Sequence, residues 1–595
     1  MLVVSKDPIG CSDTKIAEGV TTVRASAEDG DTEAVLSENL RIAGGDLPPP
    51  EITQAFAQDT EDAYNWLRRH GVRPRIDQAR GTPRTLPIPL GGHTHRRSIG
   101  HDNGGLAFGH AAWNAVVQGI DYLEDAWFLD IVTESGADGP VVRGGIVYDA
   151  IRGCFVAVRA PAVIIAAGGL STLYYPKTDT MRGNTGDSYA LALRAGAELV
   201  DMEQTQFLPF CLTAPPSYEG LLVGEPATAG FLGVLRDARG KVLLDAVMVH
   251  TRAECSAAIV RAVADGRGTE RGGCYLDLTG NVKAERSGVY YKNFMETSLA
   301  GVMTTVRQAL GRKAAAFQEI WEVRPGAHYA MGGARVNEHG ATVADNGAPA
   351  VHGLFAAGQA MGGVFGANRL GSTSLAEGPI FGARAGRAAA ELARAGNSMA
   401  DPVFETHLAP YRNMLGHAGS KPASALIRRL QEACWNGIGP ARTADGMDDF
   451  MAELSDIRRD ADDAAIGPEA LWNQSFIDAV ELANMLDTAE AVARAAQDRP
   501  ESLGAHVRLD GPEASLLFAK THSVVVRRDA DGDWTLSHAA RPPTPWRRLL
   551  GYAIRDRKRK AALKLLRLLP VAVQDRILEK RYRATMGAIA EPDAA

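Results

Sequence analysis

Three glycine-rich segments have residue types that could bind a flat, anionic ligand. They are His328-Tyr-Ala-Met-Gly-Gly333, Gly353-Leu-Phe-Ala-Ala-Gly-Gln359 and Gly366-Ala-Asn-Arg-Leu-Gly-Ser-Thr-Ser-Leu-Ala-Glu377. A predicted strand at 354–357 leads into Gly358, where small residues let the backbone approach a flat molecule closely. The segment from Gly371 onward begins a predicted helix, whose free N–H groups suit a carbonyl or an anion. Together these segments predict a cofactor site.

The elements that must position this site are predicted from hydrophobic patterns. The apolar run at 2–5 predicts a strand that leads through a loop into a helix. Apolar runs predict a series of β-strands, of which the last is fully buried and ends at Gly168 and Gly169; the runs are 128–132, 145–148, 155–158 and 162–167. Residues 61–71 predict a surface helix that stops at a glycine. The pattern is that of an α/β protein.

The second half of the chain changes character. Residues 207–322 are mixed, and polar helical sequence replaces the glycine-rich texture near residue 395. One predicted helix before Pro500 has an apolar face, formed by Leu482, Met485, Leu486, Ala489, Val492 and Ala493. The runs 523–527 and 534–537 predict a hairpin around 529–533. A strongly basic stretch with many leucines follows from Trp546 to Arg583.

Composition narrows the classes of protein. At 595 residues the chain is long enough for several domains, and 45% hydrophobic with 23% charged residues is typical of a globular enzyme. A net charge of −7 gives no reason to expect nucleic-acid binding. The six cysteines form no C-x-x-C pair, so we expect no metal centre and a reducing, cytoplasmic compartment. No apolar run reaches the roughly 18 residues of a membrane span, and no secretory signal begins the chain.

The block from His328 to Glu377 resembles, almost residue for residue, the C-terminal flavin-binding part of the fumarate reductase and succinate dehydrogenase flavoproteins, a family that includes L-aspartate oxidases. Other segments resemble family motifs in the same order along the chain and extend the resemblance over roughly residues 1 to 540. These are Ser12-Asp-Thr14 through Gly19, Gly91-Gly-His-Thr-His-Arg-Arg97, Ala166-Ala-Gly-Gly169, Thr185-Gly-Asp-Ser188 and Glu501-Ser-Leu-Gly-Ala-His506. The basic tail lies outside the resemblance.

The resemblance implies an α/β fold: a Rossmann-like FAD-binding domain, N-terminally truncated, with an inserted α+β capping domain and a C-terminal helical domain. The FAD-binding domain would comprise 1–206 and 323–395, and the capping (substrate) domain 207–322. A helical bundle at 396–500, a small hairpin region at 501–540 and a basic amphipathic tail at 541–595 would follow.

FAD is the implied cofactor, bound non-covalently because Asp13 stands where covalent family members have the histidine that bonds to the flavin. Gln359 replaces the usual acidic residue at the ribityl chain, and an amide can both donate and accept there. The implied flavin contacts are Lys6, Ser12, Thr14, Ala166, Gly168, Gly169, Asp187, Gln359, Ser374 and Leu375.

The implied catalytic residues match the family only in part. His328 and Arg369 match two carboxylate-binding residues, and Glu225 lies in the family's active-site segment. Three positions depart from the pattern: Leu208 replaces a substrate histidine, Gly224 a threonine and Thr228 an arginine that exchanges the proton. A threonine cannot replace a charged guanidinium. The residue that exchanges the proton is therefore left unnamed.

The loop at 90–97 offers replacements for the lost cations. His95 and Arg96, together with His93 and Arg97, could contact substrate, or they could be surface or structural residues. Leu90 replaces the glutamate with which aspartate oxidases receive a substrate ammonium, and an apolar group would leave that charge unpaired. The expected reaction is hydride transfer between flavin and a small, carboxylated substrate.

Two other functions stay open. The chain could be the flavoprotein component of a complex with an iron-sulfur partner, with the basic tail as a docking element. It could also be a catalytically degenerate member that serves in interactions. The tail itself could contact anionic lipid at the inner face of the membrane, or could be a solvated helix packed on its own protein.

The N-terminus lacks a motif that the family implies. Family members begin with a strand and a G-x-G-x-x-G turn, which places the pyrophosphate on a helix N-terminus, and no such motif precedes Leu2. Either the true start lies upstream by roughly thirty residues, or the chain is truncated and holds FAD weakly. We favour the first because the downstream motifs remain uninterrupted.

Overall fold

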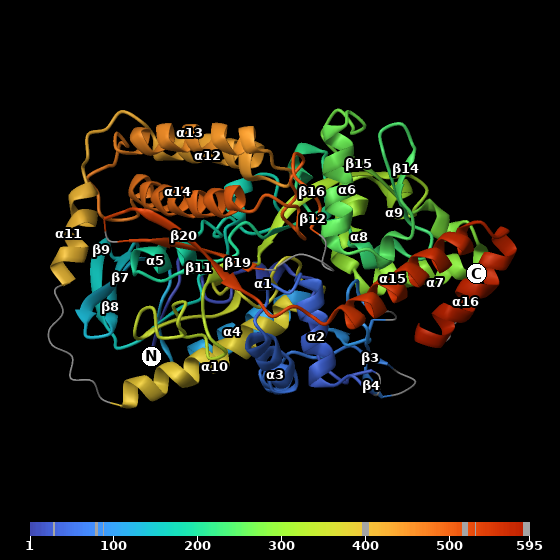
Figure 1. The fold of residues 1–595 in the computed structure, drawn as a ribbon, viewed down its shortest axis with the longest axis horizontal. Coiled ribbons are helices and arrows are strands. Elements are labelled where there is room, and N and C mark those ends of the chain that lie inside the picture. The colour runs from blue at the N-terminus through green and yellow to red at the C-terminus, as the bar shows by residue number, and fades with distance from the viewer. Residues whose placement is uncertain are drawn as a thin grey trace.

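The computed structural model describes residues 1–27, 30–77, 81–86, 89–395, 404–514, 522–529 and 531–586. Figure 1 shows an α/β part on the lower left, a set of long helices above it, and a second α+β part on the right.

Short parallel strand pairs form the centre of the α/β part. β1 (Leu2–Val4) pairs with β6 (Asp121–Leu123), and β10 (Val163–Ile165) pairs with β18 (Leu354–Ala356). The strands predicted at 2–5, 162–167 and 354–357 are therefore confirmed in shorter form. β10 ends early because the chain turns at Gly168, whose φ of +81° lies in the left-handed region that favours glycine.

Helices and a meander surround these pairs. The meander is antiparallel, in the order β7-β8-β9 (Ala126–Gly136, Gly139–Asp149, Cys154–Arg159), and confirms the predicted strands at 128–132, 145–148 and 155–158. The smaller pairs are β2–β5 (Val20–Thr22, Ser98–Gly100) and β3–β4 (Ile76–Asp77, Thr82–Pro83). The helices are α1 (Asp13–Ile16), α2 (Glu33–Ala43), α3 (Pro50–Arg69), α4 (Gly104–Val117), α5 (Asp187–Arg194) and α10 (Ser374–Arg394).

Helix α3 is longer than the sequence pattern predicted. The prediction began at residue 61, whereas the helix begins at Pro50, which stands at the first helical position. Ile52, Phe56, Ala63 and Leu67 are all buried at helical spacing, so one apolar face continues upstream of the charged stretch that marked the prediction.

The second α+β part is built on an antiparallel sheet, and we call it the capping part. Its strand order is β12-β16-β15-β13-β14. These strands are Thr205–Leu212, Trp321–Ala330, Cys274–Asp277, Val234–Arg236 and Val242–Leu244. Its helices are α6 (Arg252–Ala264), α7 (Glu285–Ser298), α8 (Ala300–Ala309) and α9 (Arg312–Ala315). The proposed boundaries at 206/207 and 322/323 stay predictions; they fall within β12 and β16, which enter and leave the capping part as an antiparallel pair.

The long helices form the third part. α12 (Ala423–Ile438), α13 (Ala444–Ala461) and α14 (Gln474–Asp498) lie side by side along the top of Figure 1, and α11 (Phe404–Met414) lies at their left. All six residues of the predicted apolar face of α14 are buried. The predicted bundle helix is therefore confirmed, and it extends beyond the predicted face at both ends.

Two elements at the C-terminal end return to the other parts. β19 (His522–Arg528) and β20 (Trp534–Ala540) form the predicted hairpin and join β11 (Leu199–Val200) and β17 (Gly333–Ala334) in one sheet. The basic tail is two helices, α15 (Trp546–Arg567) and α16 (Val571–Met586), which pack on the capping part at the right of Figure 1. They separate at Pro570, because proline cannot continue a helix.

Candidate functional site

The carboxyl ends of β10 and β18 bring together two of the segments predicted to bind cofactor. Because the strands are parallel neighbours, the Gly168–Gly169 turn lies beside Gly358 and Gln359. A β-carbon added at Gly169 would lie 2.3 Å from Gln359 Nε2, so a larger residue there would displace the Gln359 amide. Gly358 has a φ of +62° and faces open space. Ligands of open α/β sheets bind outside this edge of the strands.

Polar groups at this edge lack protein partners, as a cofactor site requires. Nε2 of Gln359 is buried and has no hydrogen-bond partner among the described residues. The side chain of Thr373, the N-cap residue of α10, accepts no hydrogen bond from the helix. The N–H groups of Ser374 and Leu375, at the start of this 21-residue helix, therefore stay available to a ligand. An amide and a helix N-terminus suit the carbonyls and hydroxyls of a flavin, so these residues fit FAD.

Two other predicted flavin contacts pair with each other. Lys6 Nζ donates to Asp187 Oδ2 at 2.8 Å, to Thr185 Oγ1 at 2.6 Å and to Glu481 Oε1 at 3.1 Å. Burial opposes the charge on Asp187, but the Lys6 ammonium holds the pKa of this carboxyl below its usual range. The pair fixes the start of α5 against α14, and the predicted cofactor role of these two side chains stays a prediction.

The Ser12–Thr14 segment forms the N-terminal side of the site. Ser12 is the exposed N-cap of α1, and the backbone of Thr14 contacts α4 so closely that Gly105 has no room for a side chain. Asp13 accepts hydrogen bonds from Met181 N at 2.8 Å and from Asn184 Nδ2 at 2.6 Å. Burial raises the pKa of Asp13. The carboxyl at the family's histidine position is thus held by hydrogen bonds to the chain itself.

His328 and Arg369, the predicted carboxylate-binding residues, are brought together. His328 Nε2 lies 2.9 Å from Arg369 Nη2, and His328 Nδ1 lies 2.9 Å from Asp179 Oδ1. Since the guanidinium can only donate, Nε2 accepts and Nδ1–H donates to the carboxylate. Ser374 accepts from Arg369 Nη1 at 2.6 Å, which ties this group to the start of α10.

Arg252 completes the group from the capping part. It is the first residue of α6, is 6% exposed, and its Nε donates to Glu225 Oε2 at 2.9 Å. Gln206 on β12 connects the two arginines: its Oε1 accepts from Arg369 Nε at 3.1 Å and from Arg252 Nη1 at 3.5 Å. A β-carbon at Gly371 would lie 3.6 Å from Arg252 Nη2, so this guanidinium lies against the third glycine-rich segment.

The charges in this group perturb one another. Burial and the neighbouring Arg252 lower the pKa of Arg369 to about 9. Burial would raise the pKa of Glu225, but Arg252 holds it below its usual range, so Glu225 is ionised. Arg369 also lies over the ring of Tyr329 at 4.8 Å, and the Tyr329 hydroxyl binds Glu377. Two buried arginines with one partner carboxylate leave positive charge that suits a carboxylate ligand.

The loop at 90–97 is held together by contacts among its own residues and with Asp31. Arg97 is buried and forms an ion pair with Asp31, and its Nη1 lies 2.8 Å from His93 Nδ1. Burial and that arginine lower the pKa of His93 to about 3, so His93 is neutral. Thr94 Oγ1 contacts His95 Nδ1 at 2.9 Å. These contacts of His93, His95 and Arg97 hold the loop together, and substrate roles for His95 and Arg96 stay predictions.

The positions that depart from the family pattern are also defined. Leu208 is buried in β12, and Gly224 packs against Thr228. The Thr228 hydroxyl accepts from Glu225 N and donates to Glu225 O, both at 2.9 Å. Thr228 therefore fixes the turn that carries Glu225, and Arg252 is the arginine that meets this carboxylate.

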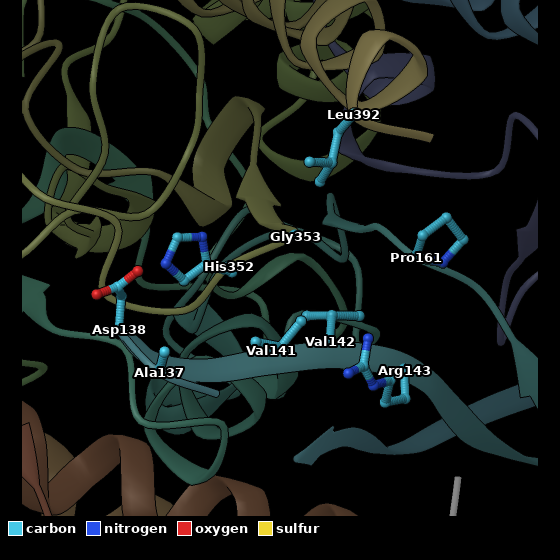
Figure 2. A pocket seen from close by; sticks show the side chains of 9 residues that line it. All are labelled: Ala137, Asp138, Val141, Val142, Arg143, Pro161, His352, Gly353 and Leu392. Atoms are coloured by element: carbon cyan, nitrogen blue, oxygen red, sulfur yellow. The ribbon is translucent and has the colours of Figure 1, made fainter. Parts of the chain in front are cut away.

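Two other features lie away from this group. A cavity of about 170 Å³ lies next to the amino ends of β10 and β18, the edge opposite the glycine turns. Figure 2 shows its lining residues: Ala137, Asp138, Val141, Val142, Arg143, Pro161, His352, Gly353 and Leu392.

Asp498, His522 and His538 gather at the end of α14 and the β19–β20 hairpin, where His538 Nε2 lies 2.6 Å from Asp498 Oδ2.

Sequence comparison decides the family. The profile of the FAD binding domain matches residues 1–375, and that of the fumarate reductase flavoprotein C-terminal region matches residues 427–552. The chain belongs to the fumarate reductase and succinate dehydrogenase flavoprotein family. This flavoprotein is therefore an FAD-dependent oxidoreductase, as the motifs predicted.

Individual relatives of the flavoprotein agree with this membership. A fumarate reductase (CoM/CoB) subunit of Methanothermobacter marburgensis is 31% identical over 85% of this chain and 88% of its own length. L-aspartate oxidase of Mycobacterium leprae is 34% identical over 86% of this chain and 88% of its own length. A variant of Escherichia coli quinol fumarate reductase FrdA superimposes with a TM-score of 0.79 at 25% identity, covering 92% of this chain and 93% of that one. The predicted fold, with its FAD-binding domain and C-terminal helical domain, is confirmed, and the N-terminal truncation stays a prediction.

Proposed function

We propose that this flavoprotein transfers a hydride between FAD and a small carboxylated substrate held between Arg369, His328 and Arg252. The single observation that supports it most is the meeting of Arg369 from the α/β part with Arg252 from the capping part, through Gln206. Among the described residues these two buried guanidinium groups share one carboxylate partner, Glu225, and they favour a second carboxylate, which the substrate supplies.

Each side chain of the proposed site has a separate role. When bound, FAD supplies the atom that gives or takes the hydride. Arg369 and His328 hold a substrate carboxylate, and Asp179 keeps the His328 ring in one orientation. Arg252 exchanges a proton with the neighbouring substrate carbon, and the ionised Glu225 keeps it charged and aligned. The capping part excludes water from this space.

Fumarate is the substrate to test first. The Methanothermobacter relative is named a fumarate reductase, and the cationic group suits a dicarboxylate. L-aspartate, after which another relative is named, is the second candidate. Leu90 disfavours it, because this side chain lies against Gly371 beside Arg252 and offers an ammonium group no partner.

One assay tests the proposal. Purified holoprotein is mixed with reduced viologen dye, and oxidation of the dye is followed on addition of fumarate or buffer. Because L-aspartate gives up electrons, it is assayed separately with an oxidised dye, and no reduction of that dye is expected. We expect turnover with fumarate that is lost in Arg369→Gln and kept in Arg384→Gln, a control on α10 that pairs with Asp59 instead. Equal turnover in both variants would contradict the site.

Flavin attachment is tested separately. Asp13 is engaged by Met181 and Asn184, which supports non-covalent FAD. After acid precipitation we expect the yellow colour in the supernatant. Colour that stays in the pellet would show a covalent link and would contradict this assignment.

The electron partner is proposed to be an iron-sulfur protein. The Methanothermobacter relative and the succinate dehydrogenase flavoprotein of Rickettsia felis are both named as subunits, which supports such a partner for this chain. Purification of the tagged chain from its own host at low salt should yield an additional protein that carries iron and acid-labile sulfide. A chain that purifies alone with full fumarate reductase activity from a physiological donor would contradict it.

The outer face of α15 supports peripheral contact with an anionic membrane surface. Among the described residues no helix is long and apolar enough to cross a membrane. Trp546, Leu550 and Ile554 form an exposed apolar stripe at four-residue spacing, flanked by Arg547 and Arg555. Vesicles with phosphatidylserine should sediment the protein and pure phosphatidylcholine vesicles should not. If Leu550→Glu sediments equally little with both kinds of vesicle, the apolar stripe is the membrane contact. If the wild type sediments equally with both, the proposed contact with anionic lipid is contradicted.

A further inference from the structure

Helix α15 contacts two separate parts of the molecule. At its start, Arg548 Nη1 lies 3.0 Å from Glu38 on α2, and the hydroxyl of Tyr552 binds Asn39 on the same helix. Further along, Lys560 Nζ lies 2.7 Å from Glu254 on α6 of the capping part. In Figure 1, α15 runs from the region of α2 toward α7 and α16. The residues that match the family profile end at 552, so most of this helix lies beyond them.

The contact of Lys560 is made on the element that carries Arg252. Glu254 and Thr251 form a capping box: Thr251 N donates to Glu254 Oε2 at 2.7 Å, and Glu254 N donates to Thr251 Oγ1 at 3.2 Å. Arg252 lies between them as the first residue of α6. An ammonium group bound to the Glu254 carboxylate therefore restrains the turn from which the Arg252 side chain extends.

Tyr552 contacts the α/β part of the site through Asn39. Asn39 Oδ1 accepts from Thr94 N at 2.8 Å and from Arg97 Nη1 at 3.0 Å. Arg97 in turn contacts His93, whose Nε2 lies 3.1 Å from the carbonyl of Gly371. Tyr552 is thus linked by hydrogen bonds to the glycine-rich segment against which the Arg252 guanidinium lies.

Apolar contacts anchor the second half of α15 to the capping part. Leu563 and Leu566 of α15, and Leu578 and Tyr582 of α16, belong to the hydrophobic core of the capping part. The start of α15 is bound to α2 by polar contacts at Glu38 and Asn39. The helix is consequently anchored at one end by apolar packing and held at the other by hydrogen bonds.

We propose that Lys560 and Tyr552 are positioning residues that hold Arg252 in register with His328 and Arg369. The inference rests on the proposed function. The position of Arg252 relative to His328 and Arg369 matters only if Arg252 exchanges a proton with a substrate that the other two residues hold. A displacement of about 1 Å at a reacting group can lower a rate by on the order of 100-fold. The Lys560–Glu254 pair is partly exposed and therefore modest in strength. Loss of this one contact should lower the rate about tenfold without abolishing it.

The first experiment compares four holoproteins in the fumarate assay: wild type, Lys560→Ala, Lys560→Arg and Lys564→Ala. Lys564 is exposed further along α15 and serves as the matched control. We expect Lys560→Ala to lower kcat about tenfold with KM within about twofold, because the carboxylate-binding residues are untouched. Lys560→Arg should restore most of kcat, and Lys564→Ala should match wild type. Equal kcat in Lys560→Ala and wild type would overturn the proposal.

A second measurement keeps the two proposals distinguishable. Amide hydrogen exchange of the first turns of α6, around Cys255 and Ser256, should be faster in Lys560→Ala and in Tyr552→Phe than in wild type and Lys564→Ala. This result requires no turnover. If no fumarate reduction is seen but exchange changes as expected, the substrate assignment fails and the restraint by α15 stands. Unchanged exchange in both variants would overturn the restraint whatever the activity.

Discussion

Glu225 and Arg252 form an ion pair between a 3₁₀ turn and the first turn of α6, with Arg252 Nε 2.9 Å from Glu225 Oε2. The pair faces Gln206 and Arg369, and so it joins the capping part to the α/β part. Its position makes Arg252 our candidate for the proton-exchanging residue that the sequence left unnamed.

Arg252→Gln should lower kcat for fumarate by about 100- to 10,000-fold, the usual range for loss of a proton-exchanging group. FAD content should not change, since the flavin contacts lie elsewhere. Because Glu225, whose side chain is 28% exposed, would lose its charged partner, stability should also fall. Adding Glu225→Gln should restore stability but not activity. Arg261→Gln on the same helix is the control; activity of Arg252→Gln within about twofold of this control would exclude the role.

Asp179→Asn should weaken substrate binding through His328. Without the carboxylate, the Nδ1–H of His328 loses a charge-assisted acceptor worth about 1.5–3 kcal/mol, or roughly 10- to 100-fold in affinity. The dissociation constant of malonate, an unreactive dicarboxylate, can be read from the change it causes in the flavin spectrum. Thr180→Val, next to Asp179, removes a hydroxyl that bonds Ser171 and Thr178, and serves as the control. Equal malonate affinity in Asp179→Asn and wild type would contradict the assignment.

Glu377 should make stability depend on pH. Burial raises the pKa of its carboxyl from 4.5 to about 8. Between these two values the folded protein holds a proton that the unfolded chain releases. The stabilisation that the protonated Glu377 gives to the fold is therefore complete below pH 4.5 and is lost as the pH rises toward 8. Over that window the free energy of unfolding should fall by up to about 1.4 kcal/mol per pH unit. Glu377→Gln should remove this component in urea titrations between about pH 5 and 8; identical slopes for both proteins would refute it.

Gly169→Ala should reduce FAD retention. The added methyl group would lie 2.3 Å from Gln359 Nε2 and would push this amide out of the glycine turn. Gly378→Ala on α10 adds a methyl group into open space and is the matched control. The ratio of absorbance at flavin and protein wavelengths after gel filtration measures retention. If both variants keep the same flavin content as wild type, the turn does not border the cofactor.

The cofactor edge could be predicted from sequence because its signals are local. Gly168, Gly169 and the strand before Gln359 indicate a turn at the end of a strand, and the two strands pair as neighbours. Backbone geometry near a flat ligand restricts residue type at each position, and such restriction survives in the sequence of a single chain.

The proposed catalytic group could be predicted only in part because its members are assembled by tertiary contacts. Arg252 and Asp179 come from α6 and from a loop, far along the chain from His328. One local signal was present for Arg252: Thr251 and Glu254 have capping-box spacing, which marks a helix start and places Arg252 at its first turn. For Asp179 no comparable pattern exists in the sequence.

In the loop at 90–97 the sequence signal was present but did not separate binding residues from structural ones. His95 and Arg96 are candidates because cations cluster there, yet the neighbouring Arg97 and His93 bind Asp31 and Gly371. Charge alone does not separate a ligand contact from an internal ion pair, since both require the same residue types. Burial decides between them, and burial is a property of the fold.

The pairing of β10 with β18 has a consequence for how the protein is made. The sheet of the capping part and its helices α6 to α9 lie between these two strands in sequence, and so the ribosome synthesises them before the partner of β10 exists. The flavin edge cannot close on the nascent chain until β18 and the start of α10 have emerged. Since FAD is predicted to bind at this edge, we expect cofactor capture to be a late event in the biosynthesis of this chain.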